Sequence, residues 1–147
     1  MGKKILVSAC LLGICCRYDG RGNPNHNVLS LLDREDVTLI PVCPEQLGGL
    51  PTPRIPSERQ GRNVVNRAGE DVTPQFIRGA EEALRIAKAY GCTTAILKER
   101  SPSCGCGKVY DGTFSGKLTD GDGVTTELLR LNGIQVYGES GISELLD

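Results

Sequence analysis

Short apolar runs alternate along the chain with segments whose apolar residues recur at helical spacing. Runs of apolar and β-branched residues predict strands over 3–9, 37–42, 93–98 and 134–137. The clearest helix is expected over 74–90, and shorter helices over 26–33, 124–132 and 143–146. This alternation, with short αβ connections, predicts a mostly parallel sheet of about four to five strands covered on both faces. The expected fold is a single-domain α/β, Rossmann-like three-layer sandwich.

Turn and capping residues set the expected boundaries. Thr73 is a candidate N-cap with Pro74 at the first helical position, and Gly91 supplies the C-terminal stop. Asn25 or Asn27 is expected to cap the helix over 26–33. The proline-rich stretch 44–72 reads as a long irregular loop with a hairpin over 64–71 that turns at Ala68-Gly69. Residues 107–123 are glycine-rich and predict a loop with room for a short ribbon.

Three of the predicted strands each end at or just before a cysteine. Cys10 follows the first strand, Cys43 the second and Cys104 the third, in the loop Ser-Pro-Ser-Cys-Gly. In an open α/β sheet, ligands bind at the carboxyl ends of the strands. If the strands are parallel neighbours, the three sulfurs lie on one edge of one sheet.

Composition narrows the function classes. The chain has 147 residues, which suits one domain over 1–147, and 17 basic against 18 acidic residues. Without a basic stripe, and with few aromatic residues, it lacks the features of a nucleic-acid groove. No apolar run is long enough for a membrane helix, and the start does not resemble a signal peptide, so a cytoplasmic protein is expected. Seven cysteines in a reducing compartment favour metal binding or reactivity over disulfides.

Three thiolates without an obvious fourth ligand suggest an incomplete coordination shell. Structural zinc takes four ligands and iron–sulfur clusters normally take four cysteines. A cubane held by Cys10, Cys43 and Cys104 would leave one iron open as a Lewis acid. A single buried cysteine is more commonly a small hydrophobe, so spacing alone leaves open a shared site or three unrelated thiols. Cys106 could serve as an alternative ligand.

Four polar residues near these cysteines are candidates for chemistry. Glu45, two residues after Cys43, is either a solvated loop carboxylate or a general acid/base. Ser101 and Ser103 either stabilise the turn around Pro102 or orient a substrate. Arg54 is either a solvated arginine or a ligand for an anion or carbonyl.

Several motifs together resemble the bacterial DUF523 family, which includes the thiouracil desulfidases. They are Ser8 to Gly13, Arg17 to Gly20, Pro41 to Glu45, Gly48 to Arg54, Lys98 to Gly105 and Tyr110 to Phe114. The resemblance implies a [4Fe-4S] cluster held by Cys10, Cys43 and Cys104, with one iron free to take the substrate's sulfur. It further implies that Glu45 handles protons and water and that Ser101 lies near the substrate. It assigns no role to the other four cysteines.

The expected function is therefore non-redox, hydrolytic removal of sulfur from a small thiolated base such as thiouracil. Two alternatives stay open: a carrier of sulfur or of a cluster, and a zinc-stabilised binding domain with Cys106 as fourth ligand. The near-neutral charge disfavours a large RNA as partner. The oligomeric state is undetermined, with a homodimer as one alternative. An exposed iron predicts that purification in air can remove or replace the cluster.

Overall fold

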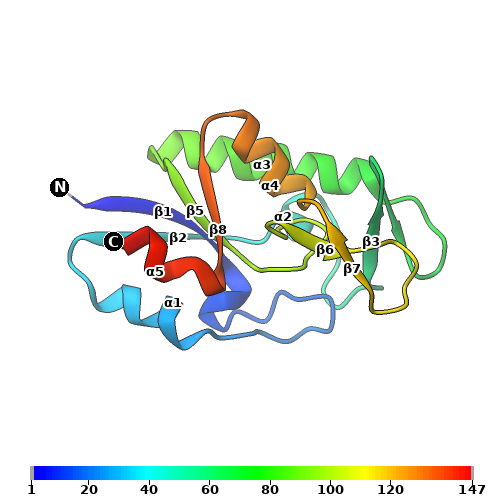
Figure 1. Ribbon diagram of the computed structural model, residues 1–147, viewed down its shortest axis with the longest axis horizontal. Coiled ribbons are helices and arrows are strands. Elements are labelled where there is room, and N and C mark those ends of the chain that lie inside the picture. The colour runs from blue at the N-terminus through cyan, green and yellow to red at the C-terminus, as the bar shows by residue number, and fades with distance from the viewer. Residues whose placement is uncertain (1, 147) are drawn as a thin grey trace.

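A four-stranded parallel sheet forms the centre of the computed structural model, which describes residues 2–146 (Figure 1). The strands are β1 (Lys3–Ser8), β2 (Val37–Val42), β5 (Thr94–Leu97) and β8 (Gln135–Gly138). Their order is β2-β1-β5-β8, and every neighbouring pair is parallel. Pro41 lies in β2, an edge strand, where a residue without an N–H is tolerated.

Helices cover both faces of this sheet, as the sequence predicted (Figure 1). On one face, Ile5 and Val7 of β1 join an apolar core with residues of α1 (His26–Ser30), the 3-10 turn η2 (Leu31–Asp33) and α5 (Ile142–Leu146). On the other, Leu6 packs in a core with residues of α3 (Thr73–Tyr90) and α4 (Val124–Leu131). The period of two along β1 separates the two cores, because successive side chains point to opposite faces.

The helix ends follow local chemistry, with one correction. Asn25 caps α1 by accepting a hydrogen bond from the Val28 N–H at 3.1 Å. Gly91 ends α3 in the left-handed conformation, with φ of 73°. Thr73, expected as the N-cap of α3, is instead its first residue. Its hydroxyl accepts a hydrogen bond from Val64 N–H at 2.8 Å and so ties α3 to β4 (Asn63–Asn66).

The stretch 44–72 is more regular than the sequence suggested. It contains the short helix α2 (Pro44–Leu47), which was not predicted, and a hairpin of β3 (Ser57–Gln60) with β4. The expected pairing around Ala68-Gly69 is present only as one bridge, between Val65 and Asp71. A second ribbon, β6 (Lys108–Tyr110) with β7 (Leu118–Asp120), fulfils the expectation for 107–123.

Two glycines fix α2 against α3. A Cβ on Gly48 would lie 1.9 Å from the Gln75 carbonyl oxygen, and a Cβ on Gly79 would lie 2.0 Å from the Pro44 carbonyl oxygen. The two backbones therefore approach more closely than any other residue would allow. This contact determines where α2 lies at the end of β2. Among residues 2–146, no helix is long and apolar enough to cross a bilayer.

Candidate functional site

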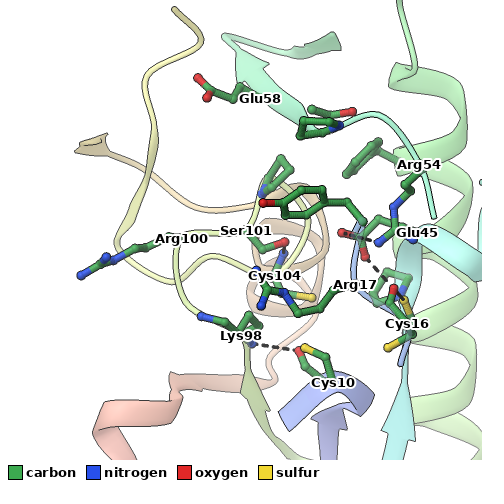
Figure 2. A pocket seen from close by; sticks show the side chains of 18 of the residues that line it. Cys10, Cys16, Arg17, Glu45, Arg54, Glu58, Lys98, Arg100, Ser101 and Cys104 are labelled. Atoms are coloured by element: carbon green, nitrogen blue, oxygen red, sulfur yellow. Dashed lines mark hydrogen bonds and ion pairs between the residues drawn. The ribbon is translucent and has the colours of Figure 1, made fainter. Parts of the chain in front are cut away.

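One cavity lies beyond the carboxyl ends of β1, β2 and β5, and residues of β3 and β6 also line it (Figure 2). Its volume is about 500 Å³, which is ample for a pyrimidine base. Four cysteines line it, together with cationic, acidic, hydroxyl and aromatic side chains. The cysteines are Cys10, Cys16, Cys43 and Cys104, and the other side chains include those of Arg17, Arg54, Lys98, Glu45, Ser101 and Phe114.

The three predicted cysteines come together as the strand pattern required. Cys10 lies in η1 (Ala9–Leu12), the 3-10 turn that directly follows β1. Cys43 follows β2 and is the N-cap residue of α2. Cys104 lies in the loop after β5 and is 3% exposed. Adjacent parallel strands place these residues at one edge of the sheet, and all three side chains border the same cavity.

The surroundings of Cys43 and Cys104 raise the pKa of both thiols. The Cys43 Sγ lies 3.5 Å from the Cys16 carbonyl oxygen and 3.9 Å from Glu45 Oε1, so its single S–H can donate to either acceptor. A hydrogen bond with Cys16, then burial, raises the pKa of Cys43. Burial, reinforced by the nearby Glu45 carboxylate, raises the pKa of Cys104. A metal that binds here must displace these protons.

The loop that presents Cys104 is stabilised by its own serines. The Ser101 Oγ accepts hydrogen bonds from the backbone N–H groups of Ser103 and Cys104, each at 3.1 Å, and it also borders the cavity. Ser103 is fully buried, its Oγ lies 2.7 Å from Thr125 Oγ1, and it is absent from the cavity lining. Ser103 therefore anchors the loop on α4, whereas Ser101 combines a turn role with access to the cavity.

Glu45 and Arg54 form an ion pair inside the cavity wall. Arg54 Nη2 lies 3.7 Å from Glu45 Oε2, and the two side chains are 9% and 13% exposed. Arg54 Nη1 also donates to the Pro51 carbonyl oxygen at 3.3 Å and to Thr52 Oγ1 at 3.2 Å. The sequence suggested both residues separately but could not show that they pair. Figure 2 shows them on the same side of the cavity, above Cys16.

Two contributors were missed in the sequence. Cys16, taken as unassigned, is 2% exposed and borders the cavity. Lys98 is held at the cavity by Glu139, whose Oε2 lies 2.9 Å from Lys98 Nζ. For Cys16, the only indication in the sequence was its position next to the motif Arg17 to Gly20. The contact between Lys98 and Glu139 could not be predicted from local sequence, because the two residues are 41 positions apart.

The remaining cysteines lie apart from the cavity lining. Cys15 is exposed and Cys92 is buried in the core beside α3. Cys106 accepts a hydrogen bond from Arg130 Nη2 at 2.9 Å. Among the described residues, no three His, Cys, Asp or Glu side chains are close enough together to hold a single metal ion. Cys106 is not among the residues that line the cavity, so the structure does not support a zinc site that it completes.

Fold and site together define an α/β protein with a cysteine-lined ligand cavity at the ends of parallel strands. The model of the 2-thiouracil desulfurase family matches residues 5–141, and the chain belongs to this family. It is 42% identical over 152 residues to the uncharacterized protein YbbK of Bacillus subtilis (strain 168), covering 97% of this chain and 99% of that protein. It is also similar to the solved structure of the [4Fe-4S]-dependent thiouracil desulfidase TudS, with a TM-score of 0.91 and 49% identity over 98% of this chain and 95% of that one.

Proposed function

We propose that the protein is a [4Fe-4S]-dependent desulfidase that hydrolyses the C=S bond of a thiouracil-like base. The observation that carries the proposal is a single cavity in which three strand-end cysteines meet the Glu45–Arg54 pair. Membership of the 2-thiouracil desulfurase family and the likeness to TudS support the same activity. The overall reaction adds one water and releases sulfide, so no electrons are gained or lost.

The donor set of the cavity fits a cluster of this kind. Cys10, Cys43 and Cys104 would hold it, because thiolates are the ligands that iron–sulfur clusters require. A cluster bound by three cysteines supplies one iron as a soft Lewis acid for a thiocarbonyl sulfur. Ser101 and Ser103 contribute indirectly by fixing the loop of Cys104.

Glu45 is the group that handles protons. Its carboxylate takes a proton from the attacking water and returns it to the departing sulfur or the ring nitrogen. Arg54 holds this carboxylate in place through the 3.7 Å ion pair, and its two further hydrogen bonds fix the guanidinium. The Ser101 oxygen already accepts two N–H groups, so its own hydroxyl hydrogen is free to donate to the carbonyl oxygen of the base.

The cellular setting follows from the thiols. All seven cysteines are free, which suits a reducing compartment, and we place the protein in the cytoplasm. The substrate is a small thiolated base rather than a large RNA, in keeping with the near-neutral charge. A sulfur carrier would instead need a second protein before any sulfur left the base.

The deciding experiment assays iron and acid-labile sulfide per chain after anaerobic purification, together with turnover of thiouracil. We expect about four iron and four sulfide in the wild type. Each of Cys10→Ser, Cys43→Ser and Cys104→Ser should lose the cluster and the turnover, whereas Cys92→Ser, a buried cysteine away from the cavity, should keep both. Zinc or no metal in the wild type would exclude the mechanism. A full cluster without release of uracil and sulfide would favour the carrier.

A further inference from the structure

The few aromatic side chains of the chain gather at the cavity. The chain contains two phenylalanines, four tyrosines and no tryptophan. Both phenylalanines, Phe76 and Phe114, and two of the tyrosines, Tyr18 and Tyr110, line the cavity. Phe76 is buried and belongs to an apolar core cluster. The other three rings are partly or largely exposed, so packing of the core does not account for their position.

The loop between β6 and β7 holds Phe114 in an unfavourable backbone conformation. Its φ is 57°, in the left-handed region that bulky residues avoid. Among residues 2–146, the one other non-glycine residue with a positive φ is Arg100, which also borders the cavity. Strained residues of this kind persist only where surrounding contacts hold them, and they cluster at active sites and ligand clamps. The fold therefore maintains Phe114 at the cavity against a local conformational cost.

Glu58 of β3 supplies contacts that hold this loop. Glu58 is nearly buried, and its Oε1 accepts hydrogen bonds from the Gly112 N–H at 3.0 Å and the Phe114 N–H at 3.1 Å. Two residues further along β3, Gln60 Nε2 donates to the Gly112 carbonyl oxygen at 2.8 Å. The guanidinium carbon of Arg67 lies over the Phe114 ring, 5.7 Å from its centroid. Backbone and ring of Phe114 are thus both held in place.

We propose that Phe114 is the surface on which the substrate base stacks, and that Glu58 positions it there. This inference rests on the proposed function. In Figure 2, Cys10 and Glu58 lie at opposite ends of the cavity. A base whose sulfur meets a cluster at the cysteine end therefore extends toward the loop of Phe114. Its flat face packs on the ring, as aromatic rings and bases do in offset stacks.

A stacking surface selects for planar, aromatic substrates. Dihydrothiouracil keeps the thiocarbonyl and the ring N–H groups of thiouracil, but its saturated carbons pucker the ring and remove the aromatic face. It therefore offers the same bond to the cluster and a weaker contact to Phe114. Because the base stacks in the ground state and in the transition state alike, loss of stacking raises KM and leaves kcat largely unchanged.

The test measures KM and kcat for thiouracil and dihydrothiouracil, anaerobically and at matched iron content. We expect Phe114→Leu to raise KM for thiouracil about 5- to 150-fold, the range that stacking on one ring contributes to base binding, and KM for dihydrothiouracil far less. Phe114→Tyr keeps the ring and should stay within about twofold of wild type. The control Tyr90→Leu removes an exposed aromatic ring of α3 that does not line the cavity, and it should change neither KM.

A second set of variants tests the positioning role of Glu58. Glu58→Ala leaves two loop N–H groups without their acceptor, so Phe114 should leave its position and KM for thiouracil should rise at constant kcat. Glu58→Gln keeps a side-chain oxygen for these bonds and should restore KM. In the Phe114→Leu background, Glu58→Ala should raise KM little further, because both changes remove the same contact. A full additional rise would show that Glu58 does not act through Phe114.

Three further results would overturn the inference. An equal rise in KM for both substrates in Phe114→Leu would exclude stacking as the cause. A loss in Tyr18→Leu with none in Phe114→Leu would assign the stacking surface to Tyr18. The third comes from calorimetric titration of thiouracil: equal affinity of wild type and Phe114→Leu would remove the contact altogether. The same titration separates the two proposals, because a wild type that binds thiouracil without releasing sulfide refutes the desulfidase alone, provided that Phe114→Leu still binds more weakly.

Discussion

We expect the ion pair between Glu45 and Arg54 to contribute far more to stability than its N···O distance alone indicates. At 3.7 Å and an effective dielectric constant of about 20, two unit charges attract by about 4.5 kcal/mol. Both side chains are nearly buried, so removing one partner leaves a charge that water cannot easily solvate. Such truncations cost about 3–5 kcal/mol. For a chain of this size, a loss of about 3 kcal/mol lowers Tm by about 10 °C.

A double-mutant cycle isolates this interaction. The proteins are wild type, Glu45→Gln, Arg54→Met and the double variant, and Tm is measured anaerobically at matched iron content. We expect each single variant to lose about 10 °C. The double variant should lose much less than the sum, because it leaves no unpaired charge.

An exposed pair on the same chain provides the control. Arg34 Nη2 and Asp36 Oδ2 lie only 2.6 Å apart, but their side chains are 41% and 61% exposed. Exposed pairs contribute about 0–1 kcal/mol, so the same cycle on Arg34 and Asp36 should give a coupling of no more than about 3 °C. Equal couplings for the two pairs, or an additive Glu45/Arg54 cycle, would refute the argument that burial outweighs distance here.

Further variants test the site and its supports. Glu45→Gln should lower kcat by about 10²–10⁴ in a steady-state assay, with iron content unchanged. Ser101→Ala leaves two backbone N–H groups without their acceptor and should cost about 1–2 kcal/mol in Tm measurements, whereas Ser101→Thr keeps the acceptor. Gly79→Ala should cost about 1–3 kcal/mol and lower kcat, because it pushes α2 and hence Glu45 out of place. Thr73 holds the pKa of Asp71 below its ordinary value of 3.8, so Asp71→Asn should destabilise the protein at neutral pH, and this difference should vanish as the pH falls through the lowered pKa.

Each of these expectations has a result that contradicts it. Full turnover in Glu45→Gln would remove the acid/base role. Equal Tm values for Ser101→Ala and Ser101→Thr would show that the hydroxyl acceptor is unimportant. An unchanged kcat in Gly79→Ala would separate the helix contact from catalysis. An Asp71→Asn deficit that persists at the lowest pH would mean that its cause is not the ionised carboxylate.

Local patterns were sufficient for the framework of this protein. Apolar runs located the four sheet strands, and helical spacing located α3 and α4, because buried faces impose those periods on the sequence. Since parallel strands share one carboxyl edge, the same reasoning also placed Cys10, Cys43 and Cys104 on one cavity. The helix α2 was missed because a helix of four residues carries too little periodicity to be recognised.

Tertiary structure alone decided the partnerships within the site. Two long-range contacts assemble this part of the site. The Arg54 N–H donates to the Tyr18 carbonyl oxygen at 2.8 Å, and the Cys16 carbonyl oxygen lies 3.5 Å from Cys43 Sγ. The need for glycine at positions 48 and 79 becomes clear only from the close contact between α2 and α3. Sequence thus determines which elements form and which edge they share, because those follow from local periodicity. The contacts across the cavity arise from packing between segments that are far apart in the chain, and no local pattern records them.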